Sequence, residues 1–143
     1  MDHPKEIEAL LPHRKPFLFV DTIIRADTEK ISAVHVFTPG EFFFQGHFPQ
    51  YPVVPGVILI EALAQAGGAG LRKIGALGGD TLFFLASVDK VKFRRPVHPG
   101  EELRMEIDNL RISAQMIKQA GKAYIGDELA AEAEWLCLVR RTP

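Results

Sequence analysis

Cysteine is nearly absent from this chain, because Cys137 is the only one in 143 residues. A single cysteine excludes a disulfide within the chain and is typical of a reducing compartment, so we expect a cytoplasmic protein. Cys137 lies in the apolar stretch 135–139, which favours a small core residue over a nucleophile. Residues 1–6 also lack the charged-then-apolar pattern of a signal peptide.

Neither an excess of charge nor a common nucleotide-binding or hydrolase motif is present. The formal net charge of −1 gives no basic field for nucleic acid. The sequence contains no Gly-x-Ser-x-Gly, no phosphate-binding loop and no dinucleotide fingerprint. His13, His35 and His98 lack zinc-ligand spacing with one another or with Cys137. The sequence therefore supports no zinc site and shows no nucleotide-binding motif.

The longest apolar run, residues 53–71, is interrupted in ways that argue against a membrane span. Pro55, Glu61 and Gln65 lie within it, and several glycines lie near its end. A helix that is apolar all round is also what the centre of a globular core requires. We interpret the run as a buried helix and expect no membrane partner.

The chain is expected to contain one long helix among several strands. A short amphipathic helix is predicted at 5–11 and the long helix at 56–75, where glycines supply its end. Strand composition or period-2 alternation marks the segments 17–25, 30–37, 81–97 and 103–112.

The segment 128–141 is ambiguous by itself. Its Ala, Glu, Leu and Arg content favours a helix, whereas its alternating apolar residues favour a strand. We interpret it as a strand, because a hairpin turn at Gly126-Asp127 needs an antiparallel partner after it. The pattern predicts an α+β fold in one domain, 1–143, with a curved sheet wrapped around the long helix. Because an apolar far side of that helix would need a cover, we also expect at least a dimer.

The stretch 46–65 says most about function. Three prolines fix their own φ and keep the chain extended after His47, until a helix begins at Gly56. Glu61 is the only carboxylate between His47 and Arg72. A carboxylate in such an apolar helix is costly to bury unless it is neutral, paired or useful.

These residues supply the three groups that elimination next to a carbonyl requires. The free N–H groups at Gly56 can polarise a thioester carbonyl and stabilise an enolate-like oxygen. Apolar neighbours should raise the pKa of Glu61 and favour the neutral acid. His47 can be a neutral base at neutral pH. A lone histidine near a turn is usually structural and a lone helix glutamate usually faces solvent, but their combination favours catalysis.

Two further groups of residues have both a structural and a functional interpretation. One is a basic stripe formed by Lys90, Lys92, Arg94 and Arg95. We favour the solvated face of a strand for the stripe, with a landing patch for an acidic partner as the alternative. Phe83 and Phe84 are most simply core residues, although they could also line an acyl tunnel.

In its motifs the chain resembles the (3R)-hydroxyacyl-[acyl-carrier-protein] dehydratases of bacterial type II fatty acid synthesis. The resemblance covers most of residues 10–107, and its most specific block runs from His47 to Glu61. The matching motifs include Leu11-Pro12-His13-Arg14, Phe43-Phe44-Gln45-Gly46-His47-Phe48-Pro49, Pro55-Gly56-Val57, Glu61-Ala62-Leu63-Ala64-Gln65 and Phe93-Arg94-Arg95-Pro96-Val97. The C-terminal part carries little family signal.

The resemblance implies a hot-dog fold, in which an antiparallel sheet wraps the long helix. It implies a homodimer, which in many family members assembles into a trimer of dimers. Each active site would combine His47 of one subunit with Glu61 of the other. His47 would be the base at C2, Glu61 would act on the departing 3-hydroxyl, and the Gly56 N–H would hold the thioester carbonyl. The implied partner is acyl carrier protein, whose phosphopantetheine arm carries the acyl chain, and no cofactor is implied.

The chain departs from the family pattern at Gln50-Tyr51 and at Ser87, which bears on chain-length preference rather than on the reaction. The favoured function is dehydration of (3R)-3-hydroxyacyl thioesters to trans-2-enoyl thioesters. One rival is hydrolysis of acyl thioesters, which has less need of a separate base at C2. The other is a non-catalytic acyl-binding or scaffold subunit, which retention of both His47 and Glu61 counts against.

Overall fold

The structure is a computed structural model that describes residues 4–142. Residues 1–3 and residue 143 lie outside the described part, so the start of the segment 1–6, which lacks a signal-peptide pattern, is not described. The helices are α1 (Pro4–Leu10), the 3-10 helix η1 (Phe42–Gln45) and α2 (Gly56–Lys73). The strands are β1 (Thr22–Ala26), β2 (Lys30–Val36), β3 (Thr81–Phe93), β4 (Glu102–Ile112), β5 (Met116–Ile125) and β6 (Glu128–Arg141).

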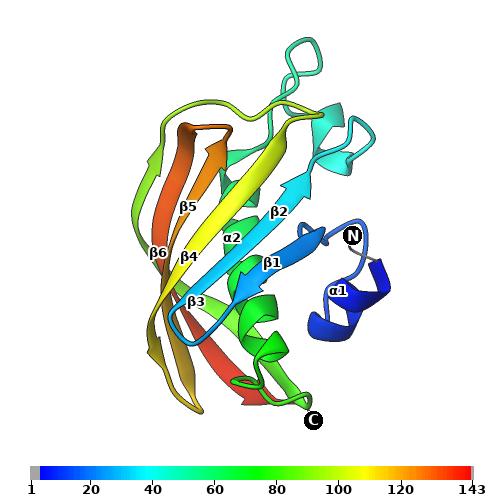
Figure 1. The fold of residues 1–143 in the computed structure, drawn as a ribbon. Coiled ribbons are helices and arrows are strands. Elements are labelled where there is room, and N and C mark those ends of the chain that lie inside the picture. The colour runs from blue at the N-terminus through cyan, green and yellow to red at the C-terminus, as the bar shows by residue number, and fades with distance from the viewer. Residues whose placement is uncertain (1–3, 143) are drawn as a thin grey trace.

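Within residues 4–142 the strands form one six-stranded antiparallel sheet in the order β1-β2-β4-β5-β6-β3. The sheet curves around α2, and α1 lies outside this wrap and packs against α2 (Figure 1). The predicted α+β hot-dog architecture, with a long helix inside a curved sheet, is confirmed.

The strand interpretation of 128–141 is also confirmed. β6 lies between β5 and β3 and forms antiparallel hydrogen bonds with both. Its alternate side chains from Ala131 to Val139 are buried against the core. Pairing on both edges and burial of one face outweigh the helix propensity of its alanines and glutamates. The turn before it contains Gly126 with φ of 57°, as a tight hairpin requires.

α2 is buried over most of its length, from Ile58 to Leu71. Its glycines allow close contact with the sheet: a Cβ at Gly68 would lie 2.1 Å from the Phe83 ring, and one at Gly67 would lie 2.1 Å from the Gln119 amide. Only glycine fits such an approach. Among the helices of the described chain, none combines the length and hydropathy needed to cross a bilayer.

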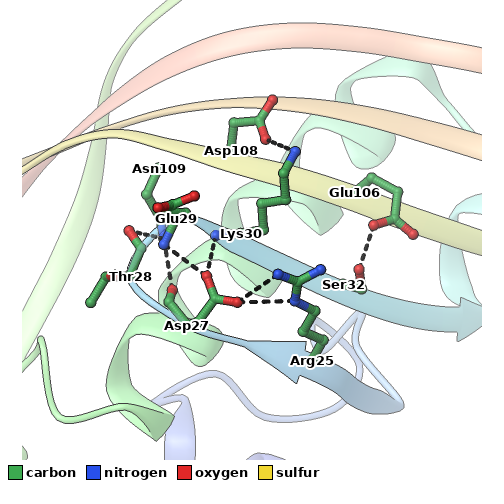
Figure 2. Close-up of polar contacts among 9 residues, drawn as sticks. All are labelled: Arg25, Asp27, Thr28, Glu29, Lys30, Ser32, Glu106, Asp108 and Asn109. Atoms are coloured by element: carbon green, nitrogen blue, oxygen red, sulfur yellow. Dashed lines mark hydrogen bonds and ion pairs between the residues drawn. The ribbon is translucent and has the colours of Figure 1, made fainter.

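The outer face of the sheet carries a polar network around the β1–β2 turn (Figure 2). Asp27 accepts hydrogen bonds from the N–H groups of Glu29 and Lys30 and pairs with Arg25 at 2.9 Å. Asn109 of β4 donates to the carbonyls of Asp27 and Thr28, and Lys30 pairs with Asp108 at 2.8 Å. The network ties the turn to β4 and keeps this face of the sheet polar.

Candidate active site

His47 lies in the loop between η1 and α2, and its ring has one preferred tautomer. The Nδ1 atom is 2.9 Å from the carbonyl oxygen of Val53. Because a carbonyl oxygen can only accept, Nδ1 carries the hydrogen of the neutral ring. The Nε2 atom therefore keeps its lone pair, as a general base requires.

The loop that carries His47 is braced against the β3–β4 connection. Val54 donates its N–H to the carbonyl of Val97 at 2.8 Å. The Nδ1 atom of His98 lies 3.1 Å from the carbonyl oxygen of Pro52, and the Nε2 atom of His98 lies 3.4 Å from the Tyr51 hydroxyl. Tyr51, one of the departures from the family pattern, is thus part of the brace although it is 60 % exposed.

Glu61 lies in the first half of α2 and is half-buried. Burial raises the pKa of its carboxyl group, and a hydrogen bond from Gln65 offsets part of that rise. Gln65 Nε2 donates to Glu61 Oε2 at 2.9 Å, across one turn of the helix. The raised pKa of Glu61 agrees with the prediction from its apolar neighbours and favours a proton donor.

Gln65 is fully buried and joins α2 to the loop that precedes β1. Its Oε1 accepts the N–H of Phe19 at 2.8 Å, and its Nε2 also donates to the carbonyl of Phe17 at 3.1 Å. The amide thus holds Glu61 in one orientation and fixes the loop beside it.

Replacing Gln65 with methionine should destabilise the fold by about 1–3 kcal/mol, because the buried N–H of Phe19 loses its acceptor. Urea unfolding followed by circular dichroism measures this. The matched control is Gln115→Met, at an exposed position where the same substitution should leave the unfolding midpoint nearly unchanged. Equal midpoints for the two variants would contradict the role assigned to the Gln65 amide.

His13 is a neighbour of Glu61 that the sequence pattern did not reveal. Its Nε2 lies 3.6 Å from Glu61 Oε2, and its ring lies 5.9 Å from that of Phe83. Burial and then the charge of Arg14 lower the pKa of His13, so it is neutral at neutral pH and adds no positive charge beside Glu61. The one available signal was its place in the Leu11-Pro12-His13-Arg14 motif.

The start of α2 leaves backbone N–H groups without a side-chain cap. Pro55 is the N-cap residue and makes no side-chain hydrogen bond. A Cβ at Gly56 would lie 2.7 Å from the ring of Phe93, so this side of the helix start admits only glycine while the ring stays there. Uncapped N–H groups at a helix start can stabilise a developing negative charge.

Within residues 4–142, His47 and Glu61 share no hydrogen bond or ion pair: the partners of His47 and Glu61 are Val53 and Gln65 respectively, with His13 nearby. The same part of the chain contains no group of three His, Cys, Asp or Glu side chains that could hold a metal ion. Cys137 is buried, and burial followed by the charge of Glu61 raises its pKa to about 12. The thiol is therefore a neutral core group, as predicted.

Comparison with known proteins decides the family. Residues 11–134 match the FabA-like domain family. The chain belongs to this family. It is 43 % identical over 136 residues to the 3-hydroxyacyl-[acyl-carrier-protein] dehydratase FabZ of Pelotomaculum thermopropionicum, covering 94 % of this chain and 96 % of that protein. It is 46 % identical over 129 residues to the protein of the same name from Desulforamulus reducens, covering 90 % of each chain.

A solved structure supports the fold of this FabA-like chain. The dehydratase heterocomplex ApeI:P from Xenorhabdus doucetiae superposes with a TM-score of 0.77 at 16 % identity, covering 96 % of this chain and 91 % of that one. At this identity the likeness concerns the fold alone.

The other predicted site residues of this FabA-like chain lie on β3 or just after it. Phe83 is half-buried against Gly68, whereas Phe84 is 52 % exposed, so the simple core interpretation does not hold for Phe84. The basic stripe is largely paired with acidic residues. The ion pairs are Lys90–Glu134 at 3.2 Å, Arg94–Glu132 at 2.8 Å and Arg95–Glu101 at 2.9 Å.

Proposed function

We propose that this protein catalyses the reversible dehydration of (3R)-3-hydroxyacyl thioesters on acyl carrier protein to trans-2-enoyl thioesters, in fatty acid biosynthesis. The observation that carries the proposal is the pairing of two groups in one motif: His47, whose Nε2 is left as an acceptor, and Glu61, whose pKa is raised by burial. The names of the curated relatives support the same reaction. We further propose that residues 1–143 form one dehydratase domain that acts in the cytoplasm.

In the proposed mechanism His47 and Glu61 move one proton each. His47 Nε2 removes a proton from C2, and the N–H groups at Gly56 stabilise the negative charge that develops on the thioester oxygen. Glu61 donates its proton to the 3-hydroxyl, which leaves C3 as water while the C2–C3 double bond forms. Deprotonation of His47 and protonation of Glu61 restore the starting state, so no co-reactant is consumed.

A homodimer is part of the proposal, because His47 and Glu61 are not joined within one chain. β3 is an end strand of the sheet and spans 13 residues. Its apolar side chains Phe84, Leu85 and Phe93 are 52 %, 42 % and 53 % exposed. A long apolar edge strand is usually covered, and pairing with a second copy would cover it. Further assembly into a trimer of dimers is compatible with this arrangement.

The acyl chain and the carrier protein can be assigned to separate parts of β3. Phe83 lies over Gly68, which is two helical turns beyond Glu61 on the same face of α2. We assign Phe83, with Phe84 beside it, to the wall of the acyl tunnel. We assign Lys90, Lys92, Arg94 and Arg95 to the contact with acidic groups of acyl carrier protein; Lys92 is exposed and has no ion pair within the described residues.

A crotonyl thioester tests the reaction in its hydration direction. Purified protein should remove the enoyl absorbance while the thiol stays esterified, because water adds across the C2–C3 double bond. Release of free thiol without loss of the double bond would instead identify a thioesterase. Absence of both changes in well-folded protein would overturn the enzymatic proposal.

A further inference from the structure

His35 of β2 is a buried histidine that the proposed mechanism does not use. It is only 5 % exposed, and its ring packs edge-on against Phe37, with a centroid distance of 4.5 Å. Both ring nitrogens face carboxylates: Nδ1 is 3.0 Å from Asp21 Oδ1, and Nε2 is 3.6 Å from Glu41 Oε1. Asp21 precedes β1 and Glu41 precedes η1, so the ring joins three elements.

The geometry at His35 fits the doubly protonated ring. A carboxylate accepts hydrogen bonds, so each nitrogen must carry a proton to interact favourably. In a neutral ring that donates to Asp21, Nε2 would direct its lone pair at Glu41. The Nε2 atom makes no hydrogen bond in the described chain, and its 3.6 Å separation from Glu41 Oε1 is an ion-pair distance. Only the imidazolium both donates to Asp21 and carries a positive charge beside Glu41.

The neighbouring charges act in the same direction. Burial alone would lower the pKa of His35, but hydrogen bonds and charge from Asp21 and Glu41 outweigh it, so the net shift is upward. Lys15 is the other charged side chain beside Asp21, and these residues line one side of a cavity of about 770 Å³.

Glu41 connects the cluster of His35, Asp21 and Glu41 to the loop that carries His47. It is the N-cap residue of η1, its Oε2 accepts the N–H of Thr38 at 2.7 Å, and its carbonyl accepts the N–H of Phe44 at 3.1 Å. At the other end of η1, the N–H of His47 donates to the carbonyl of Phe43 at 3.0 Å. Glu41 and the backbone N–H of His47 are therefore attached to opposite ends of the same short helix.

We propose that His35, held as an imidazolium between Asp21 and Glu41, is a positioning residue that fixes η1 and thereby His47. The effect on turnover rests on the proposed function, because it assumes that His47 is the base. The effect on the position of the loop that carries His47 does not depend on the proposed function. A misplaced base can lower the rate about 10- to 100-fold, and we expect a loss of turnover in this range when the charge of His35 is removed.

Two substitutions at His35 separate its charge from its volume. His35→Lys keeps a positive charge between the carboxylates, whereas His35→Gln keeps a polar side chain without the charge. At pH 7 and well below the melting temperature, His35→Gln should lower kcat about 10- to 100-fold, and His35→Lys should retain most of the activity. Thermal stability supplied by the cluster should be full below pH about 6.5 and fall as the pH rises through the raised pKa of His35, and His35→Lys should abolish this fall.

Nuclear magnetic resonance decides the question even if the protein proves not to be a dehydratase. The expected spectrum at pH 7 shows both nitrogens of His35 protonated, and the amide of His47 should exchange faster in His35→Gln than in the wild type. A neutral His35 ring, or equal exchange of the His47 amide in the two proteins, would overturn the proposal. Should His35→Gln fail to fold, Glu41→Gln provides the same comparison, because it removes one of the two charges that hold the imidazolium.

Discussion

Replacing Glu61 with glutamine will lower dehydration turnover by about 10²- to 10⁴-fold, because an amide cannot protonate the departing hydroxyl. Glutamine has nearly the same shape and can still accept the hydrogen bond from Gln65. Steady-state kinetics on a 3-hydroxyacyl thioester measure the loss. Glu128→Gln is the matched control, since it makes the same chemical change at an exposed residue in the β5–β6 hairpin.

The stability of the Glu61→Gln protein provides an independent check. Because the folded pKa of Glu61 is raised, its contribution to stability is full below the ordinary pKa of 4.5 and is lost as the pH rises through the folded pKa. Glutamine does not ionise and escapes this loss. The variant should therefore melt no lower than the wild type at pH 7.5, although its turnover is greatly reduced. Turnover close to wild type, or a large loss of stability, would argue against Glu61 as a buried acid.

Mixing His47→Ala with Glu61→Gln protein should restore about a quarter of wild-type activity, although each variant alone is expected to lose about 10²- to 10⁴-fold. If each site takes His47 from one subunit and Glu61 from the other, a mixed dimer has one intact site. Random exchange makes half of the dimers mixed. The measurement needs subunit exchange, which mass spectrometry of differently tagged chains can verify.

The double variant His47→Ala/Glu61→Gln is the control for this experiment. In a shared site it disables both sites of any dimer that it forms with wild-type protein, so equal mixing should reduce wild-type activity by about half. No recovery in the first mixture, together with no inhibition in the second, would show that each site is built from one chain.

Local patterns were sufficient for most of the fold. The alternation from Ala131 to Val139 identified β6 although its composition favours a helix, because alternation records which face is buried. The start of α2 at Gly56 followed from the prolines before it. The short helix η1 was not predicted, since its phenylalanine-rich sequence has neither a helical nor a strand period and its N-cap residue makes no side-chain hydrogen bond to it.

The candidate site also contains residues that the sequence predicted and residues that only the structure revealed. His47, Gly56 and Glu61 were identified because they fall in one continuous motif, and the raised pKa of Glu61 followed from its apolar neighbours. The contact between His13 and Glu61 joins segments 48 residues apart, so no local spacing encodes it. His35 was considered only as a metal ligand, because its carboxylate partners come from two separate loops that the β1–β2 pairing brings together.

The polar network around Asp27 also determines where the protein can be modified without harm (Figure 2). Its ion pairs are exposed to solvent. The region around the β1–β2 turn contains none of the residues assigned to the active site, to the exposed edge of β3 or to the carrier-protein contact. It lies on the side of the sheet away from α2 and Glu61, and it is the natural place to attach a dye or a solid support to a working enzyme.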